Sequence, residues 1–120
     1  KAVTALAGPD RYSHFIKVAA DQRSVWGLYQ SGWALMQDDT GRSYFPVWPA
    51  EPYAEQCAVA DWQGYVSREI DLDTFLEVLL PKLQASDTEL AVFPTPADKG
   101  VVPEIAVLER DLRMELSKIE

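Results

Sequence analysis

The residues that could carry chemistry in this sequence are few, and they do not assemble into a known catalytic pattern. His14 is the single histidine and Cys57 the single cysteine. A zinc site needs several His, Cys or carboxylate ligands, and covalent catalysis needs a nucleophile beside a base, so neither site is expected. The pattern predicts His14 on a helix flank or in water, and Cys57 as a small apolar residue within a helix. We therefore expect no metal and no cofactor.

Motifs that bind phosphate or activate a serine are also missing. The six glycines are isolated from one another, so the sequence has no glycine-rich phosphate loop, and no Gly-x-Ser-x-Gly turn occurs. Asp38 and Asp39 stand side by side, but a turn accounts for both. Enzymatic activity is therefore the weaker hypothesis.

Aromatic residues are the strongest remaining signal. The segment 44–58 reads YFPVWPAEPYAEQCA and combines prolines with large aromatic side chains just before a predicted helix. Core packing is the first interpretation, because aromatic residues dominate small cores. A groove for a peptide or a small ligand is the alternative, since Trp and Tyr also anchor interfaces. The alternation of strand residues predicts one aromatic cluster between sheet and helices, formed by Trp26, Trp33, Trp48 and Trp62.

The formal charge of −8 is concentrated in the second part of the chain. Residues 1–48 carry a net charge of +1, and residues 49–120 carry a net charge of −9. Nucleic-acid binding needs a basic face that displaces counterions, so it is not expected. An acidic surface instead suits a basic protein partner, because opposite charge speeds and orients docking. Solubility alone would also explain the charge.

These observations favour a protein-binding module without enzymatic activity, in one version an acidic neutraliser of a basic partner. The alternative is a small-molecule-binding domain or an enzyme with an aromatic-lined pocket. The candidate surface lies where the third predicted strand ends and the second predicted helix begins, and it combines aromatic with acidic side chains. Its residues are Trp48, Glu51, Tyr53, Glu55, Asp61 and Trp62.

Periodic patterns predict the elements that position these residues. A first helix should begin at Asp10, its N-cap, and end near residues 21–23. Three strands follow at 24–30, 33–37 and 43–48, joined by short turns, and they predict an antiparallel meander. Because Pro46 lacks an N–H, the third strand should lie at an edge or pair on one side only.

The remaining elements are mostly helical. A second helix should start at Glu51 and end at about 61–64, and a third should begin at 70–73 with Asp71 or Asp73 as its cap and Pro81 as an interruption. A fourth short strand at 90–94 and a loop at 95–100 precede a last helix over about 103–120. The narrow apolar stripe of that helix is also a candidate homodimer contact: Ile105, Leu108, Leu112, Leu116 and Ile119.

The order of elements predicts one α+β domain over residues 1–120. We expect a small, mostly antiparallel sheet, made of a three-strand meander and a fourth short strand, with about four helices packed on it. The printed sequence has no apolar run long enough for a membrane helix and no signal-peptide pattern. We therefore expect no membrane contact and a location in the reducing cytoplasm, where a lone cysteine is common.

Several short runs resemble a bacterial family of small proteins in their order and spacing, over about residues 9–108. The runs are VWGL at 25–28, GWAL at 32–35, FPVWP at 45–49 with Glu51 and Ala54, then Trp62 and Tyr65, IDL at 70–72 with Phe75 and Leu76, and VFP at 92–94. That family is catalogued as domain of unknown function 2750. The resemblance implies a small cytoplasmic bacterial protein, and it supplies no catalytic residues.

Overall fold

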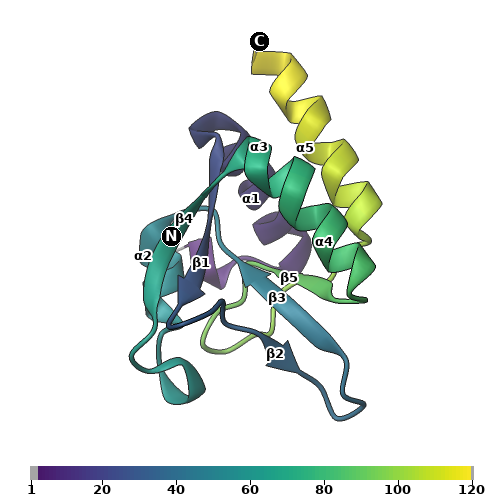
Figure 1. Cartoon of the computed structure of the whole chain (residues 1–120). Helices are drawn as coiled ribbons and strands as arrows, with labels where there is room; N and C mark the ends of the chain where they lie inside the picture. The colour runs from purple at the N-terminus through teal and green to yellow at the C-terminus, as the bar shows by residue number, and fades with distance from the viewer. Residues whose placement is uncertain (1–2, 120) are drawn as a thin grey trace.

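The computed structural model describes residues 3–119 and shows helices packed around two small, connected sheets (Figure 1). The strands are β1 (Ser24–Tyr29), β2 (Met36–Gln37), β3 (Ser43–Val47), β4 (Val66–Asp71) and β5 (Glu89–Val92). The α-helices are α1 (Gly8–Gln22), α2 (Glu51–Gln56), α3 (Leu72–Thr74), α4 (Leu80–Ala85) and α5 (Ile105–Ile119). Shorter helical turns are η1 (Val3–Ala5), η2 (Ala60–Trp62) and the π-helical η3 (Phe75–Leu79).

Backbone pairing divides the strands into two sheets that one bridge connects. β1 pairs with β4 in antiparallel fashion, and β3 lies between the antiparallel β2 and the parallel β5. The two sheets meet at Trp26 and Trp48, which exchange backbone hydrogen bonds of 2.9 and 2.8 Å. The predicted α+β class, with a small and mostly antiparallel sheet, is therefore confirmed.

The predicted meander is formed only in part. The strand expected at 33–37 is reduced to β2, because the chain turns back on β1: Trp33 bridges Tyr29, and the Ala34 N–H donates to the Leu28 carbonyl at 2.8 Å. β1 therefore pairs with β4 and not with β2. β4 is not among the predicted strands, because it is mostly exposed and runs directly into the third helix.

β3 accommodates Pro46 by changing partners along its length. Strand alternation directs the backbone of Tyr44 toward β2 and that of Trp48 toward β1, and Pro46 lies between these two pairings. On the opposite side, Pro46 is in register with Ala91 of β5. β3 is thus a central strand rather than an edge, yet at Pro46 it pairs on one side only, as one of the two predicted arrangements requires.

Two helix boundaries differ from the predicted ones. α1 begins at Gly8, with Pro9 in its first turn, where an N–H has no helical partner to lose. Asp10 therefore lies inside the first turn and is not the N-cap. α2 ends at Gln56 rather than at 61–64, because the chain is extended at the next turn and Ala60 takes a positive φ of 52°.

The third predicted helix spans 72–85 as three continuous segments, α3, η3 and α4. Asp71 caps it as predicted, since its Oδ2 accepts hydrogen bonds from two backbone N–H groups of the first turn at 3.1 and 3.3 Å. Pro81 cannot donate the bond of a regular α-helix, and the turn before it is widened: the Leu80 N–H donates to the carbonyl of Phe75, five residues back. Pro81 thus interrupts the α-helical pattern without ending the helix.

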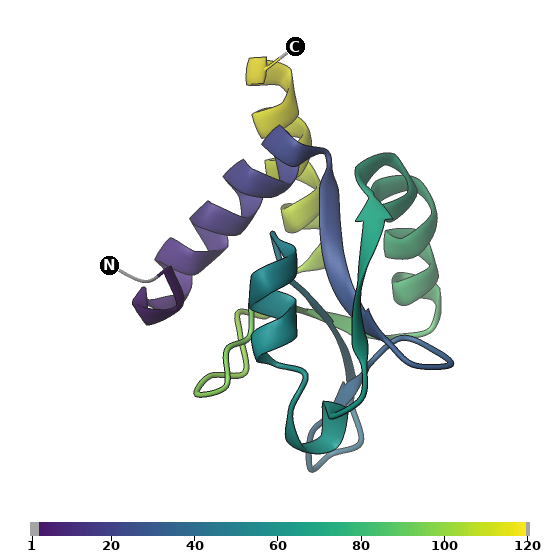
Figure 2. The ribbon, with the colours of Figure 1, turned by 90° about the vertical axis from the view of Figure 1, so that its left-hand side faces the viewer.

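The β1–β4 pair stands between α1 and α2 on one side and the α3–α4 helix on the other, as Figure 2 shows. α5 packs on α1, and the predicted stripe of α5 is buried except for Ile119, which is 48 % exposed. Fully buried large side chains come from every layer and include Phe15, Trp48, Phe75, Phe93 and Leu108.

Candidate functional site

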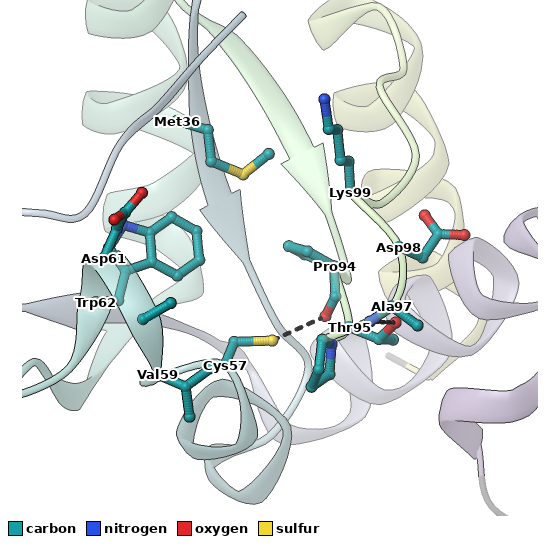
Figure 3. Close-up of a pocket in the computed structure, with 12 residues that line it drawn as sticks. Met36, Cys57, Val59, Asp61, Trp62, Pro94, Thr95, Ala97, Asp98 and Lys99 are labelled. Atoms are coloured by element: carbon teal, nitrogen blue, oxygen red, sulfur yellow. Dashed lines mark hydrogen bonds between the residues drawn. The ribbon is translucent and has the colours of Figure 1, made fainter.

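A mainly apolar hollow of about 430 Å³ lies between the turn after α2, the start of β2 and the loop after β5 (Figure 3). We call it the Trp62 groove. Val59 and Trp62 line it from the turn, Met36 from β2, and Pro94 from the segment that follows β5. Three charged residues, Asp61, Asp98 and Lys99, also line the groove.

The loop 95–100 forms one wall of the groove and is shaped by its own hydrogen bonds. The Thr95 N–H donates to the Asp98 carbonyl at 2.8 Å, and Asp98 Oδ1 accepts from the Gly100 N–H at 2.7 Å. Gly100 has a φ of +93°, and a Cβ there would lie 2.7 Å from the Val92 carbonyl oxygen. Glycine is therefore required at this position for both reasons.

Arg11 of α1 braces this loop from behind. Its side chain is buried, with Nη1 donating to the Leu6 carbonyl at 2.7 Å and Nε donating to the Phe93 carbonyl at 3.2 Å. Nη2 forms an ion pair with Asp98 Oδ2 at 3.2 Å, without the alignment of a hydrogen bond. The Gly100 N–H and the Arg11 guanidinium together lower the pKa of Asp98.

Arg11 is absent from the predicted site, although the sequence carries a signal for it. It lies one helical turn before Phe15 and two turns before Ala19, on the buried stripe of α1. A charged side chain on such a stripe has to be paired, because burying an unpaired charge is strongly unfavourable. The spacing thus indicates a buried and partnered arginine, but not which carbonyls or carboxylate it reaches.

The floor of the groove is built on the carbonyl oxygen of Pro94. Trp48 Nε1 donates to it at 2.8 Å, and the Cys57 thiol donates at 3.4 Å. Trp48 is fully buried by these contacts, so it belongs to the core and not to the surface on which it was expected. Burial also raises the pKa of the Cys57 thiol, which favours its uncharged form.

All four tryptophans belong to the core cluster or pack against it, but their rings do not form one continuous stack. Trp62 packs edge-on against Trp48, with ring centroids 6.1 Å apart and an interplanar angle of 89°. Trp33 packs instead against Tyr29 and Phe45, at centroid distances of 5.2 and 5.7 Å. The reason is the turn back after β1, which places the Trp33 ring over Gly27 and away from the groove.

Tyr53 lies on the inner side of α2 and does not line the groove. Its ring is 4.9 Å from that of Phe93 and 6.3 Å from that of His14, with the latter pair edge-on. Of the two expected positions, on a helix flank or in water, the second is wrong: His14 is a residue of α1 that lies half-buried beside aromatic rings. Both side chains contribute packing between α1, α2 and the end of β5.

Glu51 and Glu55 lie one turn apart on the exposed face of α2. Both accept hydrogen bonds from the Ser67 hydroxyl of β4, at 2.9 and 3.3 Å. Asp61 and Trp62, by contrast, lie in the groove. The structure thus separates the predicted site residues into a groove pair, an acidic pair on α2, and the packed Trp48 and Tyr53.

Two opposite charges in the groove lack partners. In residues 3–119, neither the Asp61 carboxylate nor the Lys99 ammonium group makes a hydrogen bond or an ion pair. Both also line a second hollow of about 270 Å³, which adjoins the groove beside β2 and shares Met36 and Trp62 with it. A ligand at this junction would meet an aromatic ring, a flexible thioether and two free charges of opposite sign.

The described residues contain no cluster of three or more His, Cys, Asp or Glu side chains arranged to hold a metal ion. Within the same part of the chain, no helix is both long and apolar enough to cross a membrane.

A sequence model of the family described as Protein of unknown function (DUF2750) matches residues 12–112. The match runs from α1 into α5 and includes every lining residue of the Trp62 groove. Comparison with curated proteins gave no match, and comparison with solved structures gave none either.

Proposed function

The chain belongs to the family described as Protein of unknown function (DUF2750), and we propose that it is a protein-binding module that uses the Trp62 groove as its contact surface. The observation that carries this proposal is Trp62 itself, a half-buried ring in the wall of a mainly apolar hollow of about 430 Å³. Tryptophan is among the side chains that most often dominate the binding energy of protein interfaces, especially when it lies in a desolvated pocket.

Contacts within the chain hold two walls of the groove in place. Trp62 rests edge-on against the buried Trp48, and the loop 95–100 is held by Arg11 and by the backbone geometry of Gly100. A surface that is ordered before binding loses less conformational entropy when a partner docks. This preorganisation supports recognition of a defined side chain rather than loose, non-specific contact.

The polar groups of the groove support a segment that carries charge beside an apolar anchor. Asp61 is free to accept from a basic side chain, and Lys99 is free to donate to an acidic one or to a carbonyl. The net charge of −8 favours an overall basic partner. An acidic neutraliser of such a partner is the concrete form of the proposal.

The test compares partners captured by three forms of the immobilised protein. The native chain and a Val78→Ala variant should retain the same partner, because Val78 is 60 % exposed on the third helix, away from the groove. Trp62→Ala should lose that partner by about tenfold or more, the usual loss for an anchor residue. Circular dichroism and the midpoint of thermal unfolding establish that each variant is folded.

Asp61→Asn provides a second arm that leaves the shape of the groove unchanged. It should weaken capture of a basic partner, and the loss should shrink at high salt because exposed charges are screened. Two results would contradict the proposal. In one, Trp62→Ala captures the same partner as the native chain; in the other, every captured protein binds Trp62→Ala at least as strongly as the native chain.

A small apolar ligand is the second candidate, because the volume of the groove lies within the range of about 300–1,000 Å³ that is typical of small-molecule sites. An enzyme with an aromatic-lined pocket belongs to the same alternative. A fragment library screened by Trp fluorescence and by thermal shift would identify such a ligand. The signature is a hit that is lost in Trp62→Ala and kept in Val78→Ala.

The remaining expectations are part of this proposal. A cytoplasmic location is supported by the lone, buried Cys57, and a bacterial source is proposed from the family resemblance alone. A homodimer through α5 has little support in the packing, because the stripe of that helix is used within the chain and leaves Met114 and Ile119 as its exposed apolar residues in the described part. Light scattering at high protein concentration distinguishes monomer from dimer.

A further inference from the structure

The outer edge of β4 is an open sheet edge. β4 pairs with β1 on one side only, and no other described strand pairs with it. The Leu72 N–H donates to the Arg23 carbonyl, which directly precedes β1. In an antiparallel ladder every second residue bonds to the same neighbouring strand, so Ile70 and Arg68 also direct their backbone groups toward β1. The N–H and C=O groups of Ser67 and Glu69 therefore point outward.

This edge is accessible to another chain. Four of the residues of β4 are exposed, and Val66 is 62 % exposed although it is apolar. Figure 2 looks onto this side of the molecule and shows β4 in front, with α2 beside it rather than over it. An uncovered edge of this kind is a template for an added strand.

The two faces of the edge differ in chemistry. Ser67 points toward α2, where its hydroxyl donates to Glu51 and Glu55, and Glu69 shares that face because side chains alternate along a strand. Arg68 points to the opposite face, where its guanidinium lies 4.3 Å from the centre of the Tyr29 ring. The face that carries Ser67 and Glu69 is therefore acidic, and the positive charge of Arg68 lies on the opposite face.

We propose that this edge accepts an extended segment of a partner protein as an additional strand. The segment alternates basic residues, which face Glu69 and the acidic pair of α2, with apolar residues, which face the exposed Val66. Main-chain hydrogen bonds to Ser67 and Glu69 provide affinity, and the alternating side chains provide specificity. This surface is separate from the Trp62 groove, and the inference does not depend on what the groove binds.

Charge also argues against a second copy of this chain as the occupant. Two β4 edges that paired with each other would bring Glu69 and the acidic pair of α2 from both copies together. Like charges on adjacent strands are destabilising, and charged residues on an edge strand commonly prevent such self-pairing. A basic segment meets no such repulsion.

The direct test uses a synthetic hexapeptide of alternating lysine and valine, blocked at both ends, as the probe. Binding is followed by fluorescence anisotropy, and amide hydrogen exchange is measured on the native protein at saturation. The N–H groups of Ser67 and Glu69 should become protected, while that of Arg68, already bonded to β1, should change little. A peptide of alternating glutamate and valine should bind at least about tenfold more weakly.

Backbone methylation of the probe supplies a control that needs no variant protein. Two further peptides carry N-methyl groups either on every lysine or on every valine. Only one set of N–H groups faces β4, so one methylated peptide should lose binding by about tenfold or more and the other should keep it. Equal binding of both methylated peptides and the parent overturns the proposal.

Variants of Glu69 complete the experiment. Glu69→Pro removes an outward N–H and leaves the ladder to β1 intact, so it should abolish binding while the unfolding midpoint is preserved. Glu69→Gln keeps the N–H and should weaken binding only a few-fold. Absence of protection at Ser67 and Glu69, or protection that rises with protein concentration in the absence of peptide, rules out the proposed occupant.

Discussion

Arg11 and Asp98 form an ion pair of 3.2 Å between the first helix and the loop that follows the last strand. The arginine is buried and the aspartate is half-exposed, so the pair links the core to the wall of the Trp62 groove. Because the same guanidinium also donates to the carbonyls of Leu6 and Phe93, it links the start of α1 to the segment that leads from β5 into the loop 95–100. The groove therefore depends on a residue that does not line it.

Replacement of Arg11 by methionine should lower the free energy of unfolding by about 2 kcal/mol or more, because two carbonyls lose their charged donor and become unsatisfied. Urea denaturation measures this loss. Arg110→Met is the matched control, since its contact with Asp111 lies at the surface, and it should change stability by less than about 1 kcal/mol. Equal effects of the two substitutions would contradict the bracing role of Arg11.

Tyr12 should make stability fall in alkaline solution. Its hydroxyl donates to Asp111 at 2.6 Å across the α1–α5 contact, and burial together with this hydrogen bond raises the pKa of Tyr12. The folded state thus holds the phenol proton more tightly than the unfolded state. The stabilisation is complete below the ordinary tyrosine pKa of about 10 and is lost as pH rises from there toward the higher pKa of the folded state.

Tyr12→Phe should remove the part of the alkaline loss that comes from Tyr12, whereas Tyr44, whose pKa is raised by its hydrogen bond to Asp38, keeps its own part. The substitution should itself lower the free energy of unfolding by about 1 kcal/mol near neutral pH, the usual value of one hydrogen bond. Unfolding in urea at several pH values up to about 11 measures both effects, below the pH range in which arginine titrates. An unchanged slope of stability against pH in Tyr12→Phe would show that another group is responsible.

Gly27 should not tolerate a side chain. A Cβ at this position would lie 2.9 Å from Trp33 Cζ3 and 3.0 Å from Cε3, inside van der Waals contact with a rigid ring. Gly27→Ala should therefore displace the Trp33 ring and destabilise the fold by about 1–3 kcal/mol, as overpacking commonly does. Near-ultraviolet circular dichroism reports the movement of the ring, and urea denaturation reports the energy.

A double substitution isolates that contact from other effects of the added methyl group. In a Trp33→Ala background, the Gly27→Ala change should cost little, because the ring that it would strike is absent. Additive losses in the double variant would place the strain in the backbone of β1 rather than in the Trp33 contact.

Cys57 should react slowly with thiol reagents in the native protein. Its side chain is 5 % exposed, its thiol donates to the Pro94 carbonyl, and burial raises the pKa of the thiol, so little reactive thiolate is present. Ellman's reagent at pH 8 should modify the native chain at least about tenfold more slowly than the chain unfolded in urea. Similar rates in both states would mean that the floor of the groove opens readily.

The sequence by itself determined the fold class and several of the local elements. The apolar stripes of α1 and α5, the Asp71 cap and the loop 95–100 follow from interactions between residues close in the chain, which is why helical spacing and turn chemistry predict them. Even the one-sided pairing at Pro46 needs only the missing N–H of a proline. These are properties that a segment carries wherever it packs.

Only the tertiary structure decided which segments meet. Strand alternation tells which side chains share a face but not which strand lies alongside, so β1 was free to pair with the short, exposed β4 instead of β2. Trp48 is buried because β1, α2 and the end of β5 converge on it, and Arg11 finds its partners in segments far along the chain. The groove exists for the same reason: Trp62 and the loop 95–100 become neighbours through long-range packing, which no local pattern encodes.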